Sequence, residues 1–426
     1  MSTPTTPDPA PGDAAPQAPL YPFANPSALE PPAEWADLRD RCPVATVRMA
    51  SGDETLLLTR YADVRGLLSD PRFSRQLVAD DAARVSATDD GGVFSKPGAV
   101  GAQDGPDDQP AISLMGGEGH RRWRRLLTRS FTVKRVQALQ PAIAARTHEL
   151  VDAMVAAGAP AALGPALGFP LPVYVICDLL GVPADAQDRF AYWSDTMLNL
   201  SRYDQEEVAA AGAEFYRYMT EHVAAKRANP GDDLLSELAA VVDAQDGRMT
   251  EAELVLTGQG LLIAGHETTS NMITKMVAML LARHERWEAL LADRSLVRTA
   301  VEESLRFDAN PGFGMPRYVS EPVEAGETTI PAGTTVVCSM ASANRDEREF
   351  AAPEDMDLRR SPNPHVAFGA GPHACIGQSL ARVELQTVLS VLLDRLPTLE
   401  LAVDPAELAQ RQGLIVGGID EVPVRW

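Results

Sequence analysis

From residue 120 onward, apolar residues recur every three or four positions in many segments of the chain, which is the spacing of one face of an α-helix. This pattern predicts helices over residues 120–130, 136–157, 187–201, 205–227 and 232–242. Thr250-x-x-Glu253 is a capping box, and it opens a longer helix that is apolar nearly all round and continues to about residue 283. A further helix is expected over residues 378–393.

Strand patterns are confined to two regions. Residues 44–49 and 55–59 read as a hairpin around Ser51-Gly52-Asp53, followed by a helix over residues 61–68, and residues 317–344 alternate short β-like pieces with turns. Residues 80–119 are rich in Asp, Gly, Ser and Pro and have no periodicity, so a long loop is expected there. We therefore predict a single, mainly helical domain over residues 21–426 with a small β portion.

The composition limits the cellular compartment and the classes of binding partner to be expected. Residues 1–20 hold six prolines and no apolar core, which predicts a disordered leader and not a signal peptide. The best apolar run, residues 165–182, is broken by Pro170, Pro172 and Asp178, so no membrane partner is expected. Four cysteines without paired spacing favour a reducing, cytoplasmic setting. The net charge of −21 argues against a nucleic-acid partner.

One cysteine stands in a glycine-rich loop directly before an apolar helical run, in the segment Phe368-Gly369-Ala370-Gly371-Pro372-His373-Ala374-Cys375-Ile376-Gly377. Glycines let the backbone pass close beneath a flat macrocycle, and the positive end of the following helix favours a thiolate. These features suit a heme-thiolate centre. Two alternatives are a buried structural cysteine and a zinc site built from His365, His373 and Cys375, which lacks a fourth ligand at typical spacing.

The long apolar helix carries a polar notch, Ala264-Gly265-His266-Glu267-Thr268-Thr269. Glycine and threonine are poor helix formers, and a buried carboxylate is costly without partners, so this turn indicates a functional site. A threonine hydroxyl that bonds the carbonyl four residues back can bend the helix and open a groove near Gly265, where Glu267 and Thr268 would pass protons. His266 is interpreted as structural or substrate-facing. The alternative is a kinked core helix with a satisfied glutamate.

The cysteine segment resembles the heme-binding signature of the cytochrome P-450 superfamily, F-G-x-G-x-H-x-C-x-G, at every fixed position, and the expected Ala381-Arg382 pair follows it. The notch is similar to the superfamily's oxygen-activating motif, A-G-x-[DE]-T-[ST]. The resemblance implies a triangular helical prism with a small β-sheet portion and heme b (iron protoporphyrin IX) between the long helix and the cysteine helix. By the same resemblance Cys375 ligates the heme iron, Thr268 holds dioxygen and Glu267 belongs to the proton relay.

Two further constellations fit the superfamily. Glu303-x-x-Arg306 resembles its buried E-x-x-R network, which Arg360 would complete, with Arg359 as the alternative; Met356 stands where the family usually has phenylalanine. The resemblance also implies a set of cofactor-binding residues, several of them donors to the heme propionates: His120, Arg124, Arg317, Phe368 and His373.

The implied activity is monooxygenation, by hydroxylation or epoxidation of a lipophilic small molecule with O2. A macrolide or other polyketide of secondary metabolism, as in antibiotic biosynthesis, is the leading substrate class. The pocket candidates are Phe313, Met315, Leu414, Ile415 and Ala264. The alternatives are a steroid or terpenoid hydroxylase, a peroxide-dependent heme-thiolate enzyme, and a non-catalytic heme or ligand-binding module.

Electrons must come from outside the chain, since it carries no flavin or iron–sulfur signature. Ferredoxin and ferredoxin reductase, with NAD(P)H as the ultimate donor, are the expected partners. Seven basic residues lie between positions 121 and 135 of this otherwise acidic chain, and we expect an acidic ferredoxin to dock there. An ordinary solvated helix face is the alternative.

Overall fold

A computed structural model describes residues 17–70, 72–73, 82–84, 116–183, 186–198, 202–244, 247–310, 312–411 and 416–426. The α-helices are α1 (Glu34–Arg41), α2 (Tyr61–Ser69), α4 (Gly117–Thr128), α5 (Val133–Ala157), α6 (Pro170–Leu180), α7 (Gln187–Leu198), α8 (Gln205–Ala228), α9 (Leu234–Asp243), α10 (Glu251–Leu281), α11 (His284–Ala292), α12 (Val297–Phe307), α13 (Met340–Ala343) and α14 (Gln378–Arg395). The strands are β1 (Val44–Arg48), β2 (Glu54–Leu58), β3 (Ala161–Ala162), β4 (Met315–Val319), β5 (Val323–Ala325), β6 (Thr328–Ile330), β7 (Thr334–Cys338), β8 (Glu400–Leu401), β9 (Gln410–Arg411), β10 (Gly418–Ile419) and β11 (Pro423–Arg425).

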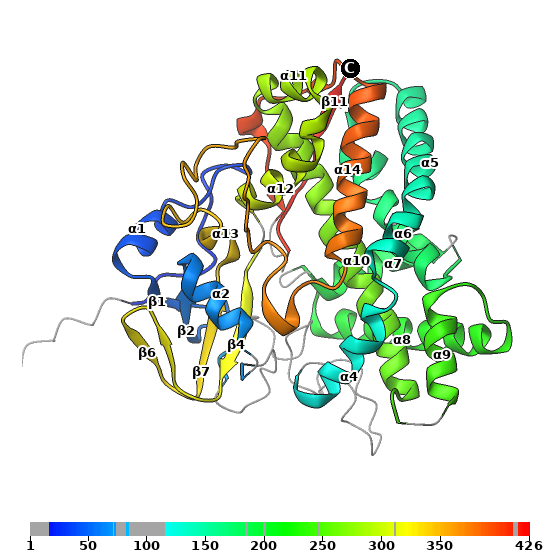
Figure 1. The fold of residues 1–426 in the computed structure, drawn as a ribbon, viewed down its shortest axis with the longest axis horizontal. Helices are drawn as coiled ribbons and strands as arrows, with labels where there is room; N and C mark the ends of the chain where they lie inside the picture. The colour runs from blue at the N-terminus through cyan, green and yellow to red at the C-terminus, as the bar shows by residue number, and fades with distance from the viewer. Residues whose placement is uncertain are drawn as a thin grey trace, which may run out of the picture.

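The main sheet lies on one side of the molecule with α1, α2 and α13, and most of the long helices lie on the other (Figure 1). The main sheet has the order β1-β2-β7-β4, in which β2 and β7 are parallel and the other neighbours are antiparallel. Three smaller sheets pair β3-β11-β8, β5-β6 and β9-β10. The expected mainly helical fold with a small β portion is confirmed.

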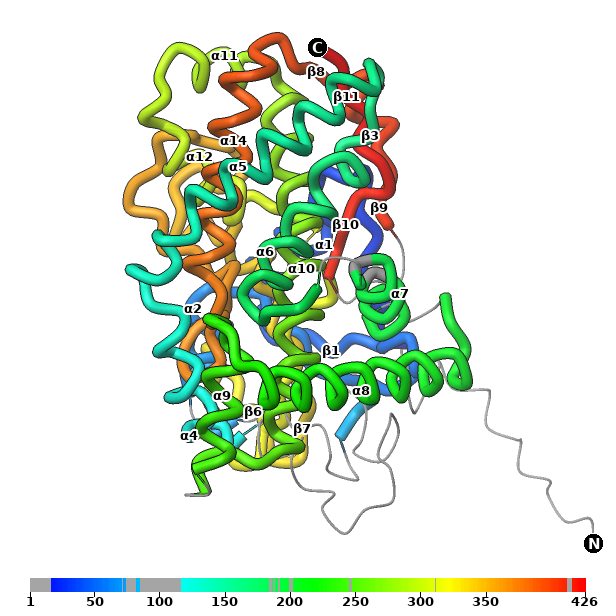
Figure 2. Tube along the Cα trace, turned by 90° about the vertical axis from the view of Figure 1, so that its right-hand side faces the viewer, coloured from blue at the N-terminus to red at the C-terminus, as the bar shows by residue number. Residues whose placement is uncertain are grey.

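Helix α10 crosses the interior of the helical side, with α6, α8, α9 and α14 against it (Figure 2). Its predicted capping box is present: the Thr250 hydroxyl accepts the Glu253 N–H, and the Glu253 carboxylate accepts the Thr250 N–H. Nearly all of its side chains are buried, because apolar residues occupy every face of it. Accessible side chains in the middle of α10 are therefore exceptions to its general burial.

Several local expectations need correction. Residues 117–119, expected in the loop, begin α4, and residues 340–343, expected in a strand-rich segment, form α13. Within the expected leader, the Pro19 carbonyl accepts a hydrogen bond from the Arg48 N–H (2.8 Å), so residues 19–20 lie beside β1. The rest of the leader up to residue 16, and most of the loop from 80 to 119, lie outside the described residues.

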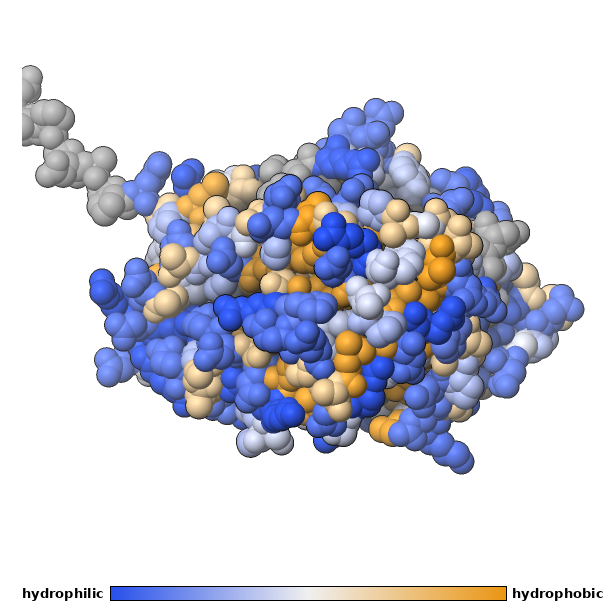
Figure 3. All heavy atoms as spheres, turned by 90° about the horizontal axis from the view of Figure 1, so that it is seen from above, coloured by the Kyte–Doolittle hydropathy of each residue, from blue (hydrophilic) through white to orange (hydrophobic). Residues whose placement is uncertain are grey.

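The surface agrees with the polar composition. The face seen from above is mostly hydrophilic, with small apolar areas separated by polar side chains (Figure 3). Among the helices of the described residues, none combines the length and the apolar character that a membrane crossing requires.

Candidate active site

The cysteine loop is held to the rest of the protein by its backbone. The Cys375 N–H donates to the Phe368 carbonyl (2.8 Å), which closes the loop on itself. Gly371 has a φ of +68°, and a Cβ there would lie 2.5 Å from the Cα of Ser69 in α2. Only glycine permits the loop to approach α2 so closely, so Gly371 is required for packing as well as for presenting the cysteine.

The Cys375 side chain combines accessibility with close protein surroundings. It is solvent-accessible, yet the protein surrounds it so closely that burial raises the pKa of its thiol. The Gly377 and Gln378 N–H groups and the charges of Arg124 and Arg382 lower that pKa but do not offset burial. The expected stabilisation of a thiolate by the helix terminus is therefore present but insufficient. A bound metal ion would complete it, because coordination deprotonates a thiol outright.

The notch in α10 opens the helix toward a second accessible surface. The Thr268 hydroxyl donates to the Ala264 carbonyl (2.8 Å), the predicted bond to the residue four positions back. Gly260, Ala264 and Thr268 are exposed at successive turns of this otherwise buried helix. The groove was expected near Gly265, but a Cβ on that residue would lie 2.9 Å from Ile176 of α6. The opening is thus on the Ala264–Thr268 face.

Glu267 is buried in a polar cluster on another face of α10. Asn271 donates to its Oε1 (3.1 Å), and the Arg411 guanidinium lies 3.6 Å from the same oxygen. His266 Nδ1 contacts the Leu262 carbonyl (2.9 Å), which places the ring proton on Nδ1. Its Nε2 has no hydrogen-bond partner among the described residues and lies 3.8 Å from Glu267 Oε2. Burial lowers the pKa of His266, so this ring is neutral.

The predicted E-x-x-R network is assembled around a fully buried Glu303–Arg306 pair. Arg306 binds both oxygens of Glu303 (2.7 and 2.8 Å) and the carbonyls of Asn344, Pro353 and Asp355. Arg360 Nε lies 3.0–3.1 Å from the two Glu303 oxygens, whereas Arg359 is exposed on the surface. Met356, which stands where the family usually has phenylalanine, is buried in the hydrophobic core.

The predicted propionate donors lie in two places. The His120 and His373 rings stack with centroids 4.0 Å apart, and Arg124 donates to the Ala374 carbonyl. These three residues thus gather at the cysteine loop. Arg317 is buried in β4 and donates to the Pro316 carbonyl (2.8 Å).

Of the pocket candidates, Ala264 lies on the accessible face of α10. Phe313 is buried against Tyr21, Val337 and neighbouring residues, so its ring belongs to the core and not to a pocket wall. Met315 is half-buried at the start of β4. Leu414 and Ile415 lie outside the described residues.

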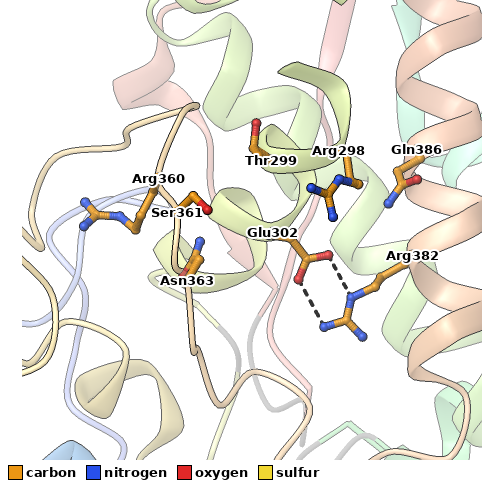
Figure 4. Close-up of a pocket in the computed structure, with 8 residues that line it drawn as sticks. All are labelled: Arg298, Thr299, Glu302, Arg360, Ser361, Asn363, Arg382 and Gln386. Atoms are coloured by element: carbon orange, nitrogen blue, oxygen red, sulfur yellow. Dashed lines mark hydrogen bonds and ion pairs between the residues drawn. The ribbon is translucent and has the colours of Figure 1, made fainter. Parts of the chain in front are cut away.

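One cluster was missed by the sequence analysis. Glu302 of α12 binds Arg382 of α14 with both oxygens, and both line a surface cavity of about 380 Å³ (Figure 4). His365, which had no assigned role, contacts the same carboxylate (3.1 Å). The position of Glu302 directly before Glu303 of the E-x-x-R motif was the available signal in the sequence. Only the fold brings His365 and Arg382 to Glu302.

The donor set fits a heme and does not fit zinc. An accessible sulfur, cationic groups at its loop and an accessible face of α10 suit a thiolate-ligated macrocycle with acidic substituents. Among the described residues, no group of three His, Cys, Asp or Glu side chains is arranged to hold a metal ion, which removes the zinc alternative.

Comparison with known proteins agrees with this geometry. The family model for cytochrome P-450 matches residues 185–412. The chain is 41% identical to nocardicin C N-oxygenase of Nocardia uniformis subsp. tsuyamanensis, over 95% of this chain and 98% of the relative. It is 38% identical to mycinamicin IV hydroxylase/epoxidase of Micromonospora griseorubida, over 95% and 98%. The crystal structure of the LnmA hydroxylase from the leinamycin pathway of Streptomyces atroolivaceus superposes with a TM-score of 0.84 at 37% identity, covering 96% of this chain and all of that one.

Proposed function

Because this chain belongs to the cytochrome P-450 family and is a heme-dependent monooxygenase, we propose that it hydroxylates or epoxidises a lipophilic secondary metabolite, with a macrolide or related polyketide as the leading class. The proposal is supported by relatives whose names include a mycinamicin hydroxylase/epoxidase and a nocardicin oxygenase. The observation that carries it is the pairing of an accessible Cys375 with the cleared Ala264–Thr268 face of α10.

We assign the cofactor as heme b, which Cys375 would hold through its sulfur. When bound, the heme supplies the activation of O2 and the oxidising power. His120, His373, Arg124 and Arg317 are the proposed partners of its propionates, because two carboxylates entering a protein interior need cationic or donor groups. The Phe368 carbonyl accepts the Cys375 N–H and so closes the loop that presents the sulfur.

Thr268 and Glu267 are the proposed proton-handling pair. The Thr268 hydroxyl donates to the Ala264 carbonyl, so its oxygen lone pairs remain able to accept a bond from a ligand on the exposed Ala264–Thr268 face. Glu267 is held by Asn271 and lies near Arg411, whose side chain is 39% exposed. This chain of polar groups supports a route by which protons reach the buried carboxylate from the surface.

We propose ferredoxin, with ferredoxin reductase and NAD(P)H, as the source of electrons, and α4 and the start of α5 as its docking surface. Not all seven basic residues of this segment are equivalent. Arg121 and Arg125 share the Glu118 carboxylate, Arg122 pairs with the buried Glu253, and Arg135 pairs with Glu237. Arg129 and Lys134 are exposed and have no ion pair within the described part of the chain. They are the strongest candidates to meet an acidic partner.

The four free cysteines support a cytoplasmic setting for this electron transfer.

A ligand screen tests the substrate class. The heme-loaded protein should show the spectral change that accompanies loss of the iron-bound water with macrolides, and turnover should require O2, ferredoxin, reductase and NAD(P)H. Product formed with hydrogen peroxide but not with ferredoxin would replace the proposal by a peroxide-dependent enzyme. Binding of steroids or terpenoids in place of macrolides would reject the substrate class alone.

A further inference from the structure

Behind the cysteine loop lies a group of four side chains, Glu302, His365, Phe368 and Arg382, which we call the Arg382 cluster. Arg382 Nε lies 2.8 Å from Glu302 Oε1, and its terminal nitrogen lies 3.1 Å from Oε2 (Figure 4). Such a two-point contact fixes the plane of the guanidinium as well as its distance. The proposed proton transfer and substrate binding do not use any of these contacts.

The remaining faces of the Arg382 guanidinium are also held. Its second terminal nitrogen donates to the Gln378 side chain (3.0 Å), and its central carbon lies 4.5 Å above the Phe368 ring. Phe368 in turn accepts the backbone N–H of Cys375. The cation therefore has one position relative to the loop that carries the sulfur.

His365 fixes the carboxylate from the other side. Its Nδ1 accepts the Ala367 N–H (3.3 Å), so the ring proton is on Nε2, which donates to Glu302 Oε2 (3.1 Å). Burial raises the pKa of Glu302, but the hydrogen bonds from His365 and Arg382 outweigh it and lower the pKa to about 2. Glu302 is therefore an anion at any physiological pH and forms a neutral pair with Arg382.

The Cys375 sulfur lies within the field of this pair. The charge of Arg382 favours the thiolate form of Cys375, and an anion bound to Arg382 at under 3 Å cancels part of that field. The strength with which a thiolate donates electron density to a metal depends on nearby charge and hydrogen bonding. The net charge of the Glu302–Arg382 pair should therefore affect a metal bound by Cys375.

We propose that Glu302 and His365 are positioning residues that set how much of the Arg382 charge the Cys375 sulfur experiences, and through it the reduction potential of the bound heme. This inference rests on the proposed ligation by Cys375, but it does not depend on the substrate or on the electron donor. It predicts opposite effects for the two members of the ion pair.

The test is a potentiometric titration of the full-length, heme-loaded protein without substrate. Glu302→Gln leaves Arg382 uncompensated, so the one-electron equilibrium should move three- to tenfold toward the ferrous form, where tenfold is about 59 mV. Arg382→Gln should move it by a similar factor toward the ferric form, and the double variant should lie between the two. His365→Ala, which keeps both charges, should shift the equilibrium in the same direction as Glu302→Gln but by less.

The controls separate a charge effect from a loosened loop. Glu149→Gln removes an exposed partner of Arg146 and should leave the potential unchanged. Shifts in the same direction for Glu302→Gln and Arg382→Gln, or no shift in either, overturn the inference. If Glu302→Gln or Arg382→Gln loses heme, the potential of His365→Ala decides between the outcomes. An unchanged potential in His365→Ala rejects the proposal. Absence of a thiolate-type carbon monoxide spectrum in the parent protein would instead reject Cys375 as the ligand.

Discussion

The imidazole rings of His120 and His373 lie face to face, with centroids 4.0 Å apart and planes inclined by 27°. One ring comes from α4 and the other from the cysteine loop, 253 positions later in the sequence. Arg124, one turn beyond His120, binds the same loop through the Ala374 carbonyl. The basic helix and the cysteine loop are therefore parts of one packed unit. In the proposed function this joins the surface that receives the electron donor to the sulfur that holds the heme.

Replacement of Cys375 by serine tests the ligand assignment. A serine hydroxyl does not form the soft thiolate bond, so the reduced carbon monoxide complex should lose the strongly red-shifted Soret band, and heme content should fall. Cys42→Ser, at an exposed and free cysteine, serves as the matched control and should keep both. A variant at Cys375 with an unaltered thiolate-type spectrum would contradict the assignment.

Replacement of Thr268 by alanine tests its proposed role in handling protons. The change removes the hydroxyl that bonds the Ala264 carbonyl, and we expect electron use to separate from product formation, with product per NAD(P)H falling several-fold and peroxide released. Thr268→Ser keeps the hydroxyl and should restore most of the coupling. Equal coupling in the alanine variant and the parent protein would remove Thr268 from the mechanism.

Glu303→Gln should destabilise the fold strongly. It leaves Arg306, with no exposed side-chain surface, and Arg360 without their shared anion, and breaking a buried ion pair on one side costs about 3–5 kcal/mol. Denaturant unfolding of the heme-loaded protein measures the loss. Glu149→Gln, which breaks an exposed pair, should cost less than about 1 kcal/mol. A comparable effect of the two changes would show that burial does not govern the network.

Glu384 makes stability depend on pH. It is fully buried in α14, its Oε2 has no hydrogen-bond partner among the described residues, and burial raises its pKa well above the ordinary value. The unfolded chain loses this proton near pH 4.3, while the folded state keeps it, so between the two pKa values stability falls as pH rises, by up to about 1.4 kcal/mol per pH unit.

Glu384→Gln cannot ionise and should remove that loss. Its melting temperature should match the parent near pH 4 and exceed it increasingly toward neutral pH, as measured by thermal unfolding at several pH values. Glu288→Gln, at an exposed glutamate of α11, should follow the parent at every pH. A parallel pH profile for the two variants would be incompatible with a neutral Glu384 in the folded state.

The docking surface is tested by reversing the exposed charges that have no internal partner. Arg129→Glu with Lys134→Glu should slow reduction by ferredoxin at least tenfold at low salt, and the difference should shrink as salt rises. Helix α11 lies at the opposite end of the molecule from α4 (Figure 1). Arg283→Glu, which reverses the exposed charge directly before α11, should leave the rate unchanged. Arg122 should be left intact, because it pairs with the buried Glu253. An unchanged rate in the double variant places docking elsewhere.

Many features of this protein depend only on residues close together in the chain, and the sequence by itself determined these features. Helical spacing, the capping box at Thr250 and the glycine frame around Cys375 depend on residues within a turn or two of one another, so the elements and the motifs were predictable. Repeated matches to one family's motifs then indicated the fold. The bond from Thr268 to Ala264 also belongs here, because it joins neighbours on one helix.

Only the tertiary structure decided contacts between distant segments. It stacked His120 on His373, chose Arg360 over Arg359 for Glu303, moved Phe313 from the expected pocket wall into the core, and brought His365 and Arg382 to Glu302. It also decided the protonation of Cys375 and Glu384, which depends on how densely the rest of the chain surrounds them. Desolvation and ion pairing are properties of packed space, and no spacing along the chain encodes them.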